Sequence, residues 1–170
     1  MQISLYPRTS TTWLFLVALA LLVSACTTVR LISDYDEPTD RALTALQQST
    51  DDFVARLIAN APSNENAFEK HKKFYEDADQ QMRRLEFRVA SIPKNDQTKK
   101  LVANIRASVL GEGKCTEDGG SLRDLHCLPA NADRGPSKTA LQINRRNVNQ
   151  TIGAALALEL AKKQGLEHNK

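Results

Sequence analysis

The sequence predicts an all-α fold, in the form of an antiparallel bundle of about four helices. Apolar residues recur at alternating spacings of three and four along four separate segments, which is typical of amphipathic helices. No segment shows the sustained alternation of β-branched residues that indicates a sheet, and no internal repeat indicates a solenoid. The pattern therefore indicates one helical domain, for which 170 residues is an ordinary length.

The charge of the chain excludes one class of partner. Lys and Arg number 23 and Asp and Glu number 20, so the formal net charge is +3. Spread over the whole chain, this charge produces a much weaker field than that of proteins that bind nucleic-acid phosphates. We therefore expect no nucleic-acid partner.

The N-terminal segment has the features of an export signal. Arg8 supplies a positive charge, an apolar stretch follows at 13–23, and the motif Val23-Ser24-Ala25-Cys26 completes the segment. This motif resembles the lipobox of bacterial lipoproteins, in which lipid is attached to the cysteine and the preceding peptide is removed. The resemblance implies a signal peptide at 1–25 and lipidation of Cys26. An ordinary secretory peptide cleaved nearby is the alternative.

The residues after the lipobox are expected to form a tether at 26–37, before a helical domain at 38–165 and a tail at 166–170. The run TTVRLISDYDEPTDRALTALQQ is similar to the mature start of small helical lipoproteins of Gram-negative bacteria, a resemblance that implies no activity. In those bacteria the residue after the lipidated cysteine influences sorting. Thr27 in this place implies the outer membrane, with the helical domain facing the periplasm.

The first predicted helix covers residues 38–60. Pro38 suits its first turn because the backbone N–H groups there have no partner within the helix. Its apolar face is formed by Leu43, Leu46, Thr50, Phe53, Val54, Leu57 and Ile58.

The second predicted helix begins after an N-cap at Ser63 and ends at Ile92, before Pro93. Its apolar positions have coiled-coil-like spacing; they are Phe68, His71, Tyr75, Ala78, Met82, Leu85, Val89 and Ile92. Two i,i+4 charge pairs are predicted, Glu69 with Lys73 and Asp79 with Arg83. Such a face also allows an extended helical hairpin completed by a second copy of the chain.

The third predicted helix is capped by Asn95 or Asp96 and ends at Gly111. Its buried positions are Leu101, Val102, Ile105 and Val109.

Pro136 and Ser137 begin the last predicted helix, which ends at Gly165. Its apolar positions are Leu141, Val148, Ile152, Ala155, Leu156 and Leu160. The alanine-rich end at 153–161 is expected to be a buried helix end rather than a membrane segment, because Glu159 interrupts it.

A long loop is predicted at 111–135, where five of the seven glycines lie. It contains Cys115 and Cys127, and export would place both thiols in an oxidising compartment. We therefore predict a Cys115–Cys127 disulfide. Two free thiols, or a metal site that includes His126, are the alternatives.

Motifs for catalysis or cofactor binding are missing from the sequence. No histidine follows a glutamate at the spacing of di-iron bundles, Lys114 lacks the context of a phosphate loop, and no nucleophile elbow occurs. His71 lies on an apolar face, where packing is the expected role and metal or haem contact the alternative. We expect no enzyme activity, no cofactor and no resident metal.

Five basic doublets lie on the predicted helices and are expected to be solvated, with an anionic partner as the alternative; they are Lys72-Lys73, Arg83-Arg84, Lys99-Lys100, Arg145-Arg146 and Lys162-Lys163. Taken together, these features favour a membrane-anchored module that binds or scaffolds other proteins. It would contact a protein partner or a second copy of the chain through the helix at 63–92 or the loop at 111–135. The alternative function is a small-ligand or metal carrier that uses His71 or a pocket beside the alanine-rich end.

Overall fold

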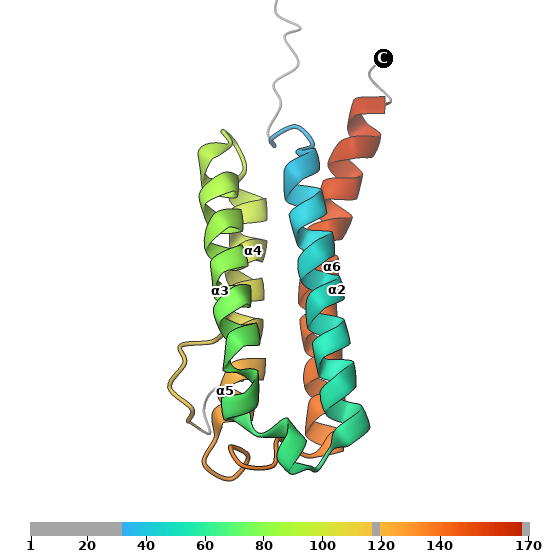
Figure 1. The fold of residues 1–170 in the computed structure, drawn as a ribbon. Helices are drawn as coiled ribbons and strands as arrows, with labels where there is room; N and C mark the ends of the chain where they lie inside the picture. The colour runs from blue at the N-terminus through green and yellow to red at the C-terminus, as the bar shows by residue number, and fades with distance from the viewer. Residues whose placement is uncertain (1–31, 117–119, 168–170) are drawn as a thin grey trace, which may run out of the picture. The chain divides into compact units, whose positions relative to one another are not determined.

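The computed structural model describes residues 32–116 and 120–167, and in this part of the chain all regular structure is helical (Figure 1). The elements are α2 (Glu37–Asn60), the 3-10 helix η1 (Asn64–Asn66), α3 (Phe68–Ser91), α4 (Asp96–Val109), α5 (Leu122–Cys127) and α6 (Lys138–Glu167). The prediction of an all-α bundle is confirmed. None of the described helices has both the length and the apolar character needed to cross a membrane.

The four long helices form an antiparallel bundle (Figure 1). α2 packs against α3 and α6, and α4 packs against the same two helices from the other side. Each helix runs opposite to its two neighbours, so α2 begins and α6 ends at the same end of the bundle. We call this the entry end, and the opposite end, which carries α5 and η1, the loop end.

The core is built from most of the positions that the spacing predicted. Fully or almost fully buried side chains come from all four long helices; they include Leu43, Leu46, Phe53, Leu57, Tyr75, Met82, Leu85, Val102, Ile105, Leu141, Val148 and Ile152. Phe68 and Leu156 are partly buried against this core. The spacing of apolar residues therefore identified most of the inward-facing positions correctly.

The start of α2 agrees with its prediction. Asp36 is the N-cap and accepts a hydrogen bond from the backbone N–H of Thr39 at 3.0 Å, and Pro38 lies in the first turn. The guanidinium of Arg88 binds both carboxylate oxygens of Asp36 at 2.6 and 2.7 Å and lowers the pKa of Asp36 to about 2. This ion pair fastens the start of α2 to the end of α3.

The predicted start of the second helix is wrong. Ser63 caps η1 rather than the long helix, and α3 begins only at Phe68. The interruption has a physical cause at Asn66, which is buried and whose side-chain amide donates to the carbonyl of Leu57 at 2.8 Å. Because Asn66 turns back toward α2, the chain forms a separate short turn before the helix begins.

One of the two predicted charge pairs is confirmed. Arg83 contacts Asp79 at 2.6 Å, whereas Lys73 pairs with Asp77 and Glu69 pairs with Lys72. The predicted Glu69–Lys73 pair is therefore wrong, since each partner has a closer residue of opposite charge.

The last helix differs from its prediction at its end. α6 continues through Gly165 to Glu167, so Gly165 does not end the helix. Residues 166 and 167, which were expected in the tail, belong to α6. Leu160, expected to be buried, is 55% exposed, whereas Glu159 is 0% exposed. The inward face of α6 thus continues through Glu159 rather than Leu160.

Candidate functional site

The region expected to be a long loop at 111–135 contains a helix that the sequence reasoning missed. α5 is only six residues long and is capped by Ser121, whose hydroxyl accepts a hydrogen bond from the N–H of Asp124 at 2.9 Å. The end of α4 lies very close to this cap: a Cβ at Gly111, where φ is +55°, would lie 2.0 Å from Asp124 Oδ2. Glycine at 111 therefore allows the chain to turn back over α5.

The predicted disulfide between Cys115 and Cys127 is confirmed, with the two Cα atoms 5.1 Å apart. It joins the chain after α4 to the last residue of α5. The alternatives of two free thiols or a metal site at these cysteines are thereby overturned. Across the described residues, no group of three His, Cys, Asp or Glu side chains is arranged to hold a metal ion.

His126 connects the elements of the loop end through two hydrogen bonds, a structural role that was not predicted from the sequence. Its ring is fully buried, and Nε2 donates to the backbone carbonyl of Asn66 at 2.7 Å. Since a carbonyl only accepts, Nε2 carries a proton; in the neutral ring Nδ1 then carries none and accepts the hydroxyl of Tyr75 at 2.8 Å. Burial lowers the pKa of His126, and burial also raises the pKa of Tyr75 well above its usual value. A neutral histidine therefore joins α5 to η1 and α3.

Aromatic rings pack around His126 at the loop end. Phe53 stacks on Phe74 with ring centroids 3.7 Å apart and meets Tyr75 edge-on at 5.6 Å. His71 packs edge-on against Phe53 at 5.4 Å, and its Nε2 donates to the carbonyl of Glu65 at 2.9 Å. His71 thus packs against the aromatic cluster, as the sequence favoured.

The segment that follows α5 is held in one shape by backbone hydrogen bonds. Phe68 N–H donates to the carbonyl of Ala132 at 2.8 Å, and Ser63 N–H donates to Arg134 at 3.1 Å. Gly135, with φ +73°, passes so close to Asn66 that a Cβ there would lie 2.5 Å from the Cβ of Asn66. The segment between α5 and α6 is therefore held against η1 and the start of α3, which preorganises this part of the loop end.

The entry end is fastened by residues 33–36, which we call the strap. Ser33 N–H donates to the carbonyl of Lys94 at 2.9 Å, and its hydroxyl donates to the side chain of Asn95 at 2.8 Å. The ammonium of Lys163 lies 5.7 Å from the centre of the Tyr35 ring, and the Tyr35 hydroxyl donates to Asp40, which raises the pKa of Tyr35 to about 12. The strap thus contacts the α3–α4 connection and α6.

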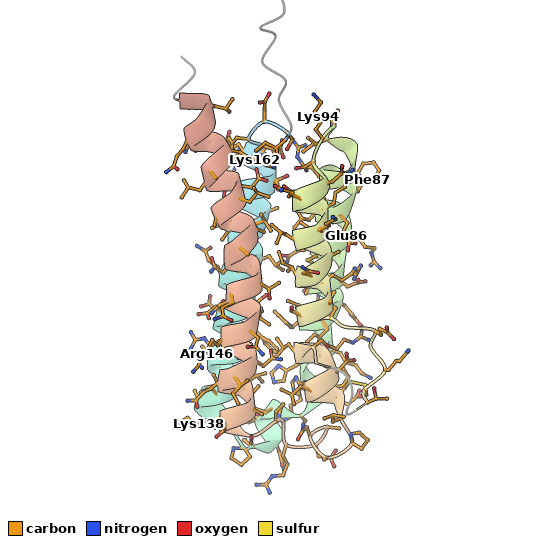
Figure 2. All side chains as sticks on the ribbon, turned by 180° about the vertical axis from the view of Figure 1, so that it is seen from behind. Glu86, Phe87, Lys94, Lys138, Arg146 and Lys162 are labelled. Atoms are coloured by element: carbon orange, nitrogen blue, oxygen red, sulfur yellow. A yellow bond between two sulfur atoms is a disulfide. The ribbon has the colours of Figure 1, made fainter. Side chains whose placement is uncertain are left out.

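A buried polar network lies beneath the strap. Lys162 Nζ donates to Glu159 Oε1 at 2.7 Å, Thr98 Oγ1 at 2.8 Å and Asn95 Oδ1 at 2.9 Å, which uses all three of its protons. The backbone N–H of Asp36 lies 3.4 Å from the other oxygen of Glu159. Figure 2 shows Lys162 and Lys94 toward this end of the bundle and Lys138 toward the other. Asn95 occupies the predicted cap position of α4, but its side chain serves this network instead of the helix end.

The expectation that Lys162 is solvated is wrong, since only 6% of this residue is exposed. The sequence contained a signal for this arrangement. Val148, Ile152, Ala155, Glu159 and Lys162 continue the alternating spacings of four and three along α6. The positive charge of Lys162 favoured a surface position in the sequence, although its place in this spacing indicates the inward face.

The remaining predicted site residue, Cys26, lies outside the described residues, as do the rest of the lipobox, Thr27 and His168. Comparison of the chain with family models, with curated proteins and with solved structures finds no match. The functional interpretation therefore depends on the sequence and on the geometry of the two ends of the bundle.

Proposed function

We propose that this chain is a membrane-anchored, non-catalytic lipoprotein of the outer membrane, and that the loop end of its bundle binds a protein partner on the periplasmic side. Lipid on Cys26 would hold the entry end near the membrane, because only five residues separate Cys26 from Ile32. A fully extended chain of that length reaches roughly 20 Å. The loop end would then be the part of the bundle farthest from the lipid.

One observation carries this proposal: the strap and the disulfide-closed region lie at opposite ends of the bundle (Figure 1). α2 contributes 24 residues, a length of about 36 Å at 1.5 Å per residue. An anchor at one end and a rigid, preorganised surface at the other is the arrangement that a scaffolding module requires. Preorganisation reduces the entropy lost on binding.

The anchor is tested by Cys26→Ser. The wild-type protein should fractionate with outer membranes and carry acyl chains, whereas the variant should remain unprocessed or become soluble. A wild-type protein that is soluble, or whose mature terminus is an unmodified residue other than Cys26, contradicts the anchor. Enrichment in the inner membrane contradicts the outer-membrane assignment alone.

The partner surface is tested by photocrosslinking in intact cells. A photoreactive amino acid replaces Ala130 or Arg134, which are exposed at the loop end, and in a matched control it replaces Gln164, exposed near the end of α6. Adducts with a second protein are expected from the first two positions and not from the control. Adducts between two copies of this chain would show that the loop end binds a second copy rather than a different protein. Equal yields of adduct from Gln164 would contradict the proposal.

A further inference from the structure

A groove between α2 and α3 carries an inference that is independent of the loop end. Its volume is about 310 Å³, and its walls come from both helices. Ala42, Ala45, Leu46 and Leu85 supply its apolar surface, with the two leucines buried and the two alanines exposed. Small side chains on α2 therefore leave an open apolar channel above the core.

The charge of the groove is one-sided. None of the seven residues that line it is acidic, and two are arginines. Arg88 is committed to Asp36 through two hydrogen bonds. Arg84 is exposed and makes no ion pair with any of the residues that the structure describes. The guanidinium of Arg84 is thus available to an anion beside an apolar channel.

The dimensions favour a small ligand over a protein. The volume of the groove lies within the range of about 300–1,000 Å³ that is typical of small-molecule sites. A stable protein interface buries roughly 800 Å² on each partner, more than seven lining residues supply. The groove follows α3 from Gln81 to Arg88, a rise of roughly 10 Å at 1.5 Å per residue. That shape fits one hydrocarbon chain lying along the helices.

We infer that this groove binds a free fatty acid, with the hydrocarbon chain lying over Leu46 and Leu85 and the carboxylate paired with Arg84. The apolar surface provides affinity through burial of methylene groups. The guanidinium provides specificity for a carboxylate, to which its planar donors are matched. This site would act independently of the protein partner proposed above.

Displacement of cis-parinaric acid, a fluorescent fatty acid, from the purified full-length protein tests the inference. Across hexanoate, octanoate and decanoate, each added methylene should strengthen binding by about two- to fourfold, and longer chains should gain little once the groove is filled. Decanol has the same chain without the charge and should bind about two- to fivefold more weakly than decanoate. Arg84→Gln should abolish this difference.

Two matched substitutions locate the site. Ala45→Phe fills the groove and should abolish displacement, whereas Ala154→Phe, at an exposed alanine of α6 outside the groove, should leave it unchanged. Circular dichroism verifies that both variants fold, and Arg84→Gln gives an independent readout at a surface position. Unchanged binding by Ala45→Phe, or equal weakening of decanoate and decanol by Arg84→Gln, would overturn the inference.

Discussion

Lys162 and Glu159 form an ion pair at 2.7 Å inside the bundle, where their side chains are 3% and 0% exposed. Removing one partner leaves the other charge buried without compensation, a change that typically costs about 3–5 kcal/mol. We therefore expect Glu159→Leu to lower the free energy of unfolding by that amount. Urea denaturation of the variant and the wild type measures the difference.

The double variant Glu159→Leu with Lys162→Met is the control for this interpretation. Because it removes both charges, it should be more stable than Glu159→Leu alone. If Lys162→Met instead lowers the free energy of unfolding further, Lys162 stabilises the fold through its hydrogen bonds to Thr98 and Asn95 rather than through charge compensation.

Acidification should destabilise the fold through His126. Its pKa is lowered in the folded state by burial, whereas an unfolded histidine has a pKa of about 6.5. As the pH falls below about 6.5, the unfolded chain takes up a proton that the fold excludes, so the free energy of unfolding decreases. Denaturation at a series of pH values between about 7 and 5 should show this decrease in the wild type.

His126→Gln is the matched variant, because glutamine does not titrate. It should be less stable than the wild type at pH 7, yet show a smaller change between pH 7 and 5. Asp36 and Asp51 do not interfere in this range, since the pKa of each is about 2 in the fold and their contribution is lost only below about pH 4. Equal pH profiles for the two proteins would refute the role of His126.

The disulfide should stabilise the loop end. Closing a loop of twelve residues contributes about 3 kcal/mol in the chain-entropy description. The variant Cys115→Ser with Cys127→Ser should therefore unfold at lower denaturant concentration than the wild type. Non-reducing peptide mapping checks the bond itself: a linked peptide pair is expected, and two alkylatable thiols in the unreduced protein would contradict it.

Two glycines should respond oppositely to alanine. Gly111→Ala places a Cβ 2.0 Å from Asp124 Oδ2 at φ +55°, and the left-handed backbone alone costs about 1–2 kcal/mol. Gly153 lies within α6 with nothing within 4 Å of an added Cβ, so Gly153→Ala should stabilise by about 0.5–1 kcal/mol. Thermal unfolding of both variants measures the two effects, and a loss of stability in Gly153→Ala would contradict the second.

The spacing of apolar residues was sufficient to predict the four long helices and most of the residues on their inward faces. Phe53, Met82 and Ile152 are buried as their positions required, because helical periodicity is a local property of the sequence. The disulfide was also predictable, since Cys115 and Cys127 are close in sequence within a glycine-rich segment.

Two of the wrong or missing predictions, α5 and the burial at the end of α6, involve contacts between residues that are far apart in sequence. α5 is too short for a periodic pattern, and its position depends partly on His126, which bonds to Asn66 sixty positions earlier. Glu159 follows the apolar spacing, but its burial depends on Lys162 and on Thr98, sixty-one positions away. A single sequence does not reveal such partners.

The packing of α6 against α2 affects how the chain folds during its synthesis. Asp51 on α2 binds Arg145 on α6, 94 positions later, and the N–H of Asp36 meets Glu159 across 123 positions. During translation, α2 emerges long before the helix that covers its apolar face. A nascent or truncated chain that stops before Lys138 therefore leaves the apolar face of α2 partly uncovered, which makes such a chain prone to aggregation and proteolysis.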